Sequence, residues 1–239
     1  MKRLFAFIGL LVLLTGCANS ASFQASDGSK LPVQAQLFLQ SQPAPTVVIT
    51  HGSAGLTPSD SNWALAARSW GYNAVAVDHY TLRGIGRHTG ELVAGAEPHT
   101  RSQDLIAVAN WIKQQPWHRG KVAVIGFSQG GAGVFSLVSD ESPYAVAVTF
   151  YPACGKMPPP TNPKIPTQVH LAQADNLSFI RRCVPTLGHA LYDVHTHENA
   201  THAFDVPYVP TTRFTHRHDA GAVEKATQQI RRFFALHLE

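Results

Sequence analysis

A serine flanked by two glycines follows an apolar run near the middle of the chain and could act as a nucleophile. Residues 122–127 read Val-Ala-Val-Ile-Gly-Phe, and Ser128 and Gly130 complete a Gly-x-Ser-x-Gly motif. The apolar run is typical of a buried strand, and the small residues after it are typical of a packed helix. A turn between such elements exposes the serine hydroxyl at the end of a sheet. A Cβ at Gly126 or Gly130 would clash where the helix folds back on the strand.

A second glycine-containing turn follows another apolar run. Residues 46–50 are largely β-branched, and His51-Gly52-Ser53-Ala54-Gly55 comes directly after them. A backbone that turns tightly and directs an N–H group at a reaction centre favours glycine and small residues. Alone, this pentapeptide would be a plain connection. Together with the serine turn, it indicates a second part of one hydrolytic site.

A serine nucleophile needs a base, and the base needs a third group that fixes its tautomer. In hydrolases with this serine turn the chain order is nucleophile, acid, histidine. The acidic residues considered after Ser128 are Asp140, Glu141, Asp175, Asp193 and Glu198. Only Asp175 directly follows a buried strand at its carboxyl end, where α/β sheets carry their chemistry. We therefore predict Asp175 as the acid.

The histidine is harder to choose, because the chain has 13 of them. The candidates considered after Asp175 are His189, His195, His197, His202, His216 and His218. We interpret His195-Thr196-His197 as placing two rings on opposite faces of a strand, which weakens a two-histidine metal site there. No metal-ligand motif appears, so no metal is predicted, although loop histidines could converge.

The elements that must position these residues alternate along the chain. Strands are expected at 31–39, 46–50, 73–78, 122–127, 145–150, 167–171 and 191–196. Helices are expected from a cap at Ser59 or Ser61 to Gly71, and at 104–114, 131–138 and 220–238. This alternation predicts a mostly parallel sheet with helices on both faces. Ser53, Ser128, Asp175 and His202 then fall in loops at its carboxyl edge.

Length and composition fit one globular domain. The chain has 239 residues, of which 44% are hydrophobic and 14% charged. Its 19 Lys and Arg against 15 Asp and Glu give a formal charge of +4. No stripe of Lys and Arg appears, so nucleic acid is not an expected partner.

The first residues are typical of an export signal. Lys2 and Arg3 precede an apolar stretch at 4–14, and Leu14-Thr15-Gly16-Cys17 resembles the lipobox of bacterial lipoproteins. We predict a signal peptide at 1–16, a lipidated Cys17 with a polar tether at 17–30, and a domain at 31–239. The alternative is an ordinary signal peptide with an incidental cysteine. Ala18 is not an acidic retention signal, which favours the outer membrane where one exists.

Two further cysteines, Cys154 and Cys183, remain if Cys17 is lipidated. An even pair in an exported chain indicates a disulfide. It would close a loop of about 30 residues and contribute about 3–4 kcal/mol to stability in the loop-entropy account. Two free buried thiols or a thiol nucleophile are the alternatives, and neither cysteine lies in a Gly-x-Cys-x-Gly turn.

These motifs together resemble the dienelactone hydrolase family. The resemblance rests on His51-Gly52, on Gly126-Phe127-Ser128-Gln129-Gly130-Gly131, on Asp175, and on Thr201-His202-Ala203-Phe204-Asp205, and it covers about residues 30–238. It implies an α/β-hydrolase fold, His202 as the base and no cofactor. Exported relatives also carry cysteines placed as Cys154 and Cys183 are here. The founding members use a cysteine nucleophile, so Ser128 favours a general serine esterase over a dienelactone hydrolase.

The resemblance also implies a mechanism. His202 takes the proton of Ser128, which attacks an ester or lactone carbonyl, and the backbone N–H groups of Gln129 and Ser53 hold the oxyanion. The partners expected are a small-molecule ester or lactone and, through the lipid anchor, a membrane. Side chains expected to contact the substrate are His51, Arg83, Arg87, Phe204 and Phe214.

Two other functions fit parts of this pattern. A surface-anchored binding lipoprotein could keep the fold without the chemistry, because fold alone does not give function. A metallohydrolase could use the histidine-rich loops. The ordered nucleophile, acid and histidine, with both turns present, favour the serine hydrolase.

Overall fold

The computed structural model describes residues 19–24, 32–86, 96–139, 141–155, 157–177, 183, 187–209 and 214–239. The signal peptide, Cys17 and Arg87 lie outside these residues. So does most of the predicted tether.

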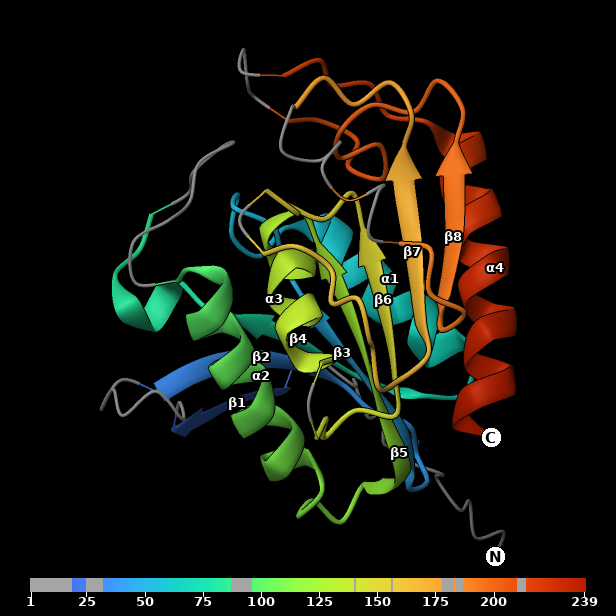
Figure 1. Ribbon diagram of the computed structural model, residues 1–239. Helices are drawn as coiled ribbons and strands as arrows, with labels where there is room; N and C mark the ends of the chain where they lie inside the picture. Colours follow the sequence, from blue (N-terminus) through green and yellow to red (C-terminus); the bar gives the residue numbers. More distant parts are fainter. Residues whose placement is uncertain are drawn as a thin grey trace, which may run out of the picture.

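An eight-stranded sheet forms the centre of the molecule, in the order β1-β2-β4-β3-β5-β6-β7-β8 (Figure 1). β1 (Asn19–Gln24) pairs antiparallel with β2 (Pro32–Phe38), which pairs antiparallel with β4 (Asn73–Asp78). All other neighbours pair in parallel. These strands are β3 (Ala44–Thr50), β5 (His118–Phe127), β6 (Val146–Phe150), β7 (Thr167–Ala172) and β8 (Tyr192–His197). The mostly parallel sheet is confirmed.

A parallel strand that is covered on both faces buries all of its residues, so apolar and polar side chains need not alternate along it. Every residue of β6 and β7 is buried. β8 lies at the edge, and only Tyr192 and His197 at its two ends are buried. This is why the run at 145–150 can be recognised as a strand from its apolar character, whereas β7 also buries the polar residues Thr167, Gln168 and His170.

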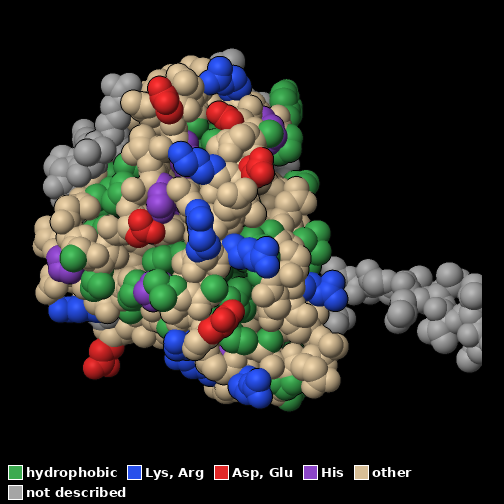
Figure 2. Space-filling model, turned by 90° about the vertical axis from the view of Figure 1, so that its right-hand side faces the viewer, with side chains coloured by type: hydrophobic (Ala, Val, Ile, Leu, Met, Phe, Trp, Pro, Cys, Tyr) green, Lys and Arg blue, Asp and Glu red, His purple; other side chains and the backbone are tan. Residues whose placement is uncertain are grey.

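Helices cover the two faces in pairs (Figure 1). α2 (Pro98–Ile112) and α3 (Gln129–Leu137) share one apolar core with the sheet. α1 (Pro58–Ser69) and α4 (Ala220–Leu238) share the core on the other face. Figure 2 shows the molecule from the side where α4 lies, with Lys and Arg side chains interspersed among Asp and Glu. This covering confirms the two-faced α/β architecture.

Several predicted boundaries were wrong. α1 is capped by Thr57, which shares a capping box with Asp60, and not by Ser59 or Ser61. α2 begins at Pro98, six residues before the predicted start at 104, because its first turns bury polar side chains that give no apolar periodicity. Asn19–Gln24 is an edge strand, so the polar tether does not extend through these residues.

A 3₁₀ turn, η1 (Thr81–Arg83), follows β4. Among the residues described, no helix combines the length and the apolar character needed to cross a membrane.

Candidate active site

The serine turn has the strained geometry that its motif predicts. Ser128 connects β5 to α3 with φ 49° and ψ −109°, a conformation that L-residues adopt rarely. A Cβ on Gly126 would lie 2.7 Å from Gly130 O, and one on Gly130 would lie 2.5 Å from Thr50 O. Both distances are too short for non-bonded atoms, so the steric need for both glycines is confirmed.

His202 lies within hydrogen-bond distance of two other predicted side chains, Ser128 and Asp175. His202 Nε2 lies 3.0 Å from Ser128 Oγ, and His202 Nδ1 lies 2.7 Å from Asp175 Oδ2. The carboxylate can only accept, so Nδ1 carries the proton and leaves Nε2 free to accept from the serine hydroxyl. Asp175 is only 2% exposed and His202 only 4%. This is the geometry that a nucleophile–base–acid triad requires.

The sheet places the acid and the histidine side by side. β7 and β8 pair in parallel, so the loops that follow them leave the same edge. Ala174 N donates to Ala200 O at 2.9 Å, which ties the two loops together. Arg217 N donates to Thr201 Oγ1 at 2.7 Å, which holds the residue next to His202. Adjacent strands therefore determine the pairing of Asp175 with His202.

The two predicted oxyanion donors belong to two different turns, one after β5 and one after β3. Gln129 is the first residue of α3, so its N–H is among those that have no intrahelical acceptor. Ser53 lies in the turn after β3 and, with Gly52, lines the pocket next to Ser128. Both backbone groups are thus at the carboxyl edge of the sheet, where the helix dipole of α3 also favours negative charge.

A pocket of about 340 Å³ opens at Ser128 and His202. Its other lining residues are Gly52, Ser53, Ala54, Gly55, Thr57, Ser59, Asp60, Phe127, Tyr151, Ala203, Asp205, Val206, Tyr208, Val209 and Phe214. Most of these are apolar or aromatic, which is typical of a small-molecule site. The pocket therefore has the size and lining of a small-molecule site next to Ser128.

Two buried carboxylates in this pocket were not predicted. Asp205 accepts hydrogen bonds from Ser59 Oγ at 2.9 Å, from Trp63 Nε1 at 3.0 Å and from the Tyr151 hydroxyl. Burial raises the pKa of Asp60 to about 7, and the nearby Asp205 charge adds to the rise. Asp205 anchors the loop that carries His202 to α1 and to the end of β6.

Tyr151 also has a strained backbone, with φ 34°. Its ring meets the His202 ring edge-on at a centroid distance of 4.7 Å. Burial raises the pKa of its hydroxyl well above the usual value, and the Asp205 carboxylate adds to this effect. Tyr151 therefore remains a neutral donor to Asp205 and packs against His202.

Of the four described side chains that were predicted to contact the substrate, only Phe214 lines the pocket, and its ring packs edge-on against His202 at 4.9 Å. His51 and Phe204 are both completely buried and do not line it. Arg83 donates to both oxygens of Asp104, each at 2.7 Å, and does not line it either. The prediction is corrected for these three residues, because hydrogen bonds hold His51, apolar packing holds Phe204 and the ion pair with Asp104 holds Arg83.

A buried polar network lies behind the turn that contains His51. His79 Nδ1 lies 2.7 Å from Asp104 Oδ2, and His79 Nε2 lies 2.9 Å from Thr50 Oγ1. Burial lowers the pKa of His79 despite the carboxylate beside it. Burial also acts to raise the pKa of Asp104, but hydrogen bonds from His79 and Arg83 outweigh it and lower that pKa. Asp104 holds the end of β3 in place through these contacts.

A second group of histidines stacks across β7 and β8. The His170 ring lies 5.3 Å from the rings of both His195 and His197, at interplanar angles of 22° and 20°. Residues two apart on a strand share a face. The interpretation that placed His195 and His197 on opposite faces is therefore wrong. Within the described ranges, no three His, Cys, Asp or Glu side chains are arranged to hold a metal ion.

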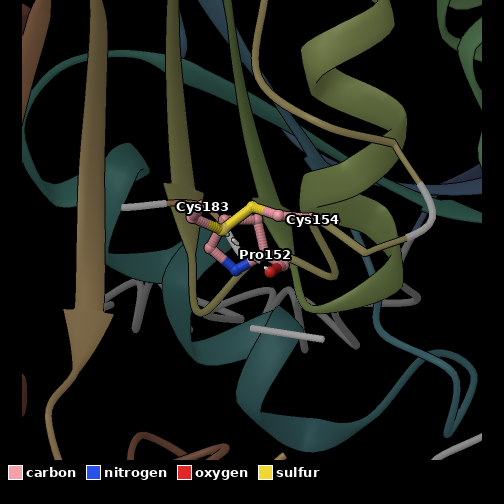
Figure 3. The surroundings of a disulfide bond; sticks show 3 residues. All are labelled: Pro152, Cys154 and Cys183. Atoms are coloured by element: carbon pink, nitrogen blue, oxygen red, sulfur yellow. Dashed lines mark hydrogen bonds between the residues drawn. A yellow bond between two sulfur atoms is a disulfide. The ribbon is translucent and has the colours of Figure 1, made fainter. Parts of the chain in front are cut away.

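The predicted disulfide is confirmed: Cys154 and Cys183 are bonded, with Cα atoms 5.2 Å apart (Figure 3). Cys183 Sγ also lies 3.5 Å from Pro152 O. This is a van der Waals contact, because a sulfur in a disulfide has no proton to donate. Cys154 and Pro152 come just after Tyr151, and Cys183 follows Asp175 along the chain. The bond thus links two segments that leave the same edge of the sheet.

The amino-terminal prediction has independent support. A model of the prokaryotic membrane lipoprotein lipid attachment site matches residues 1–18. This match indicates an exported, lipid-anchored protein. No curated protein matches the chain.

Solved structures share the fold at low sequence identity. A dienelactone hydrolase-like promiscuous phosphotriesterase from metagenomic libraries is 18% identical, with TM-score 0.70, over 92% of this chain and 99% of that chain. A dienelactone hydrolase from Anabaena variabilis is 16% identical, with TM-score 0.69 and the same coverage. A cold-adapted esterase from an Arctic intertidal metagenomic library is 15% identical, with TM-score 0.66, over 92% and 93%.

The sequence itself matches a family model over nearly the whole domain. The model describes the dienelactone hydrolase family and covers residues 33–238, which include Ser128, Asp175 and His202. With the α/β-hydrolase architecture, this match supports a hydrolase. The chain belongs to the dienelactone hydrolase family.

Proposed function

We propose that the protein is a serine esterase that cleaves a carboxylic ester or lactone through an acyl-enzyme on Ser128. The observation that carries the proposal is the continuous hydrogen-bond chain from Asp175 through His202 to Ser128, at the mouth of the pocket. A serine hydroxyl with such a base beside it is an activated nucleophile.

In the first half of the reaction, Ser128 Oγ attacks the substrate carbonyl carbon while His202 Nε2 takes its proton. Asp175 stabilises the imidazolium that forms. The N–H groups of Gln129 and Ser53 hold the carbonyl oxygen as it becomes negative, a contribution of about 3–4 kcal/mol per donor. The intermediate then expels the alkoxide, which takes the proton from His202 and leaves as the alcohol.

In the second half, a water molecule attacks the acyl carbonyl and gives a proton to His202. The acid leaves, and the proton returns to Ser128 Oγ. The balance is one ester and one water consumed, with one acid and one alcohol released. A lactone follows the same steps and releases a single hydroxy acid.

The pocket disfavours a negatively charged substrate. Its described lining residues include Asp60 and Asp205 but no Lys or Arg. A substrate carboxylate would meet like charge there. Anchored by Cys17, the enzyme would work in the cell envelope, on the outer membrane or the periplasmic side in a Gram-negative cell.

Ser128→Ala tests the nucleophile. We expect turnover of a short-chain p-nitrophenyl ester to fall by about 10³-fold or more, and labelling by a fluorophosphonate probe to disappear. Ser136→Ala, which removes another hydroxyl from α3, is the matched control and should retain both signals. Full activity in Ser128→Ala would overturn the assignment.

The same assays separate the other functions. A wild-type protein that neither labels nor turns over esters, lactones or phosphotriesters would indicate a binding lipoprotein. Loss of activity on treatment with a chelator would instead indicate a metallohydrolase, because a serine esterase needs no metal.

A further inference from the structure

Arg101, on α2, is a fully buried cation that the proposed reaction does not use. Its side chain is 0% exposed. Among the described residues, no carboxylate forms an ion pair with it. Burying an unpaired charge is costly, so its hydrogen bonds must compensate. The acceptors of these hydrogen bonds indicate the role of Arg101.

Arg101 binds the turn that follows β3. One guanidinium nitrogen donates to His51 O at 2.6 Å, and the other lies 3.4 Å from Gly52 O. That second nitrogen also donates to the Tyr80 hydroxyl at 2.7 Å, and Tyr80 donates in turn to Ser53 O at 3.1 Å. Three successive carbonyls of the turn are therefore held, directly or through Tyr80, by one guanidinium.

These bonds orient the N–H groups of the turn. The described part of the chain has no cis peptide. In a trans peptide the carbonyl of one residue and the N–H of the next point in opposite directions. With the carbonyls of His51 and Gly52 turned toward Arg101, the N–H groups of Gly52 and Ser53 are directed to the opposite side. Gly52 and Ser53 line the pocket.

His51 supports the same orientation. His79 N donates to His51 Nε2 at 3.2 Å, so His51 carries its proton on Nδ1, which lies 2.6 Å from Gly52 O. Burial lowers the pKa of His51 well below its usual value, and the Arg101 charge lowers it further. A neutral His51 and the guanidinium therefore hold the Gly52 carbonyl together.

Arg101 also contacts Gln129, whose backbone N–H is the other proposed oxyanion donor. Its guanidinium lies 3.3 Å from the side-chain oxygen of Gln129. Burial lowers the pKa of Arg101, but an arginine starts so high that it stays protonated at neutral pH. A fixed positive charge behind both donors favours negative charge on the substrate oxygen, and a buried site screens it little.

We infer that Arg101 is a positioning residue for the oxyanion site. It holds the turn at 51–53 with its N–H groups toward the substrate oxygen, and its charge favours the tetrahedral intermediate over the bound ester. This role rests on the proposed esterase function.

The packing of α2 on α3 makes this reach possible. A Cβ added to Gly133 would lie 3.2 Å from Arg101 Cβ and 3.3 Å from Pro98 O. These contacts are tighter than a methyl group normally tolerates, so Gly133 allows α2 to approach α3 closely. The close approach brings the Arg101 side chain behind the turn after β3.

The test compares Arg101→Met, Arg101→Lys and the wild type by two measurements. One is kcat and KM on p-nitrophenyl acetate. The other is the affinity for a methyl trifluoromethyl ketone. Ser128 Oγ adds to the carbonyl carbon of this ketone, and the carbonyl oxygen becomes an oxyanion that resembles the tetrahedral intermediate. For Arg101→Met we expect kcat to fall about 10- to 100-fold with KM changed less than about threefold, since the interaction acts on the transition state. Ketone affinity should fall in parallel, and Arg101→Lys should be intermediate.

Two controls separate this role from a loss of stability. Leu105→Ala removes a buried side chain from the same helix and should lower Tm without changing kcat at temperatures where it is folded. Arg68→Met removes an exposed arginine that donates to Leu39 O at 3.0 Å, and should leave both measurements unchanged.

A folded Arg101→Met with kcat and ketone affinity within twofold of wild type would overturn the inference. If that variant does not fold, Tyr80→Phe decides, because it removes the link from Arg101 to Ser53 O and keeps the guanidinium. We expect it to lower kcat and ketone affinity together by about threefold or more, and unchanged values would overturn the inference. A wild type without turnover or probe labelling would instead overturn the proposed function.

Discussion

Two sets of histidines lie close together in this protein: His202 alone, and the stacked group of His170, His195 and His197. Their neighbours give the two sets different chemistry. His202 lies between a carboxylate and a hydroxyl, 2.7 Å from Asp175 Oδ2 and 3.0 Å from Ser128 Oγ. His170 and His197 are equally buried, but they bond to each other and to an amide. A buried imidazole takes up a proton readily only where a polar or negative partner stabilises the imidazolium.

The second group forms a directed hydrogen-bond chain. His197 Nε2 lies 3.0 Å from His170 Nδ1, His170 Nε2 lies 2.9 Å from Gln168 Oε1, and Gln168 Nε2 donates to Asp193 Oδ2 at 2.7 Å. Each ring can satisfy this chain as a neutral imidazole. Burial lowers the pKa of His170 well below its usual value and that of His197 to about 4. These rings are structural at neutral pH.

Aromatic side chains separate the two groups. The Phe204 ring lies 5.0 Å from the His197 ring and 5.7 Å from the Tyr151 ring, and Tyr151 lies 4.7 Å from His202. Sequence position does not reveal this boundary, because His197 and His202 are only five residues apart.

The largest expected difference between the groups is in turnover. His202→Ala should lower kcat/KM on a p-nitrophenyl ester by about 10⁴-fold or more, because it removes the only proposed base. His197→Ala should keep kcat/KM within about fivefold and lose about 1–3 kcal/mol of unfolding free energy, measured by urea titration. If only His197→Ala abolished turnover, the assignment of the base would be wrong.

The next difference is in the pH dependence of stability. The unfolded chain protonates a histidine near pH 6.5, whereas folded His197 does so near 4. Between these values the unfolded state binds more protons, so stability is complete above pH 6.5 and is lost as the pH falls toward 4. We expect a loss of roughly 1–3 kcal/mol from His197 over this range, after allowance for solvent screening.

Urea unfolding at pH 7, 5.5 and 4.5, for the wild type and His197→Phe, measures this loss. The difference in unfolding free energy between the two proteins should shift in favour of the variant as the pH falls. Parallel curves would show that His197 does not titrate differently in the folded state.

The smallest expected effect concerns the boundary itself. Tyr151→Phe removes one of the donors to Asp205, and we expect kcat to fall about three- to tenfold because the loop that carries His202 is held less firmly. Tyr192→Phe, which removes a hydroxyl that donates to Pro160 O at 2.8 Å, is the matched control. Steady-state kinetics in which both variants behaved alike would show that Tyr151 only packs.

The sequence was sufficient for most of the fold and for part of the site. Apolar runs identified the buried strands, and the apolar stripe of α4 predicted its bounds of 220–238 correctly. The glycines around Ser128 predicted the turn because steric clashes there leave no choice of residue. Asp175 was chosen from its place after a strand, whereas the choice of His202 among many histidines needed the family resemblance.

What could not be predicted is the network of buried polar side chains. Arg101 and Asp205 are ordinary charged residues in sequence, and nothing in their spacing shows that both are buried. Their burial depends on partners distant in the chain, such as His51 for Arg101 and Ser59 for Asp205. Arg83 was misassigned for the same reason, since its partner Asp104 lies on another element.

The edge strand β1 limits how far the domain could lie from a membrane. β1 begins at Asn19, two positions after Cys17, and two residues span at most about 7 Å. In the proposed form that carries a lipid on Cys17, the sheet edge would stay close to the bilayer, and the domain would have little freedom to diffuse away from it. In that form, the candidate active site would sample only a thin layer of solution along the membrane.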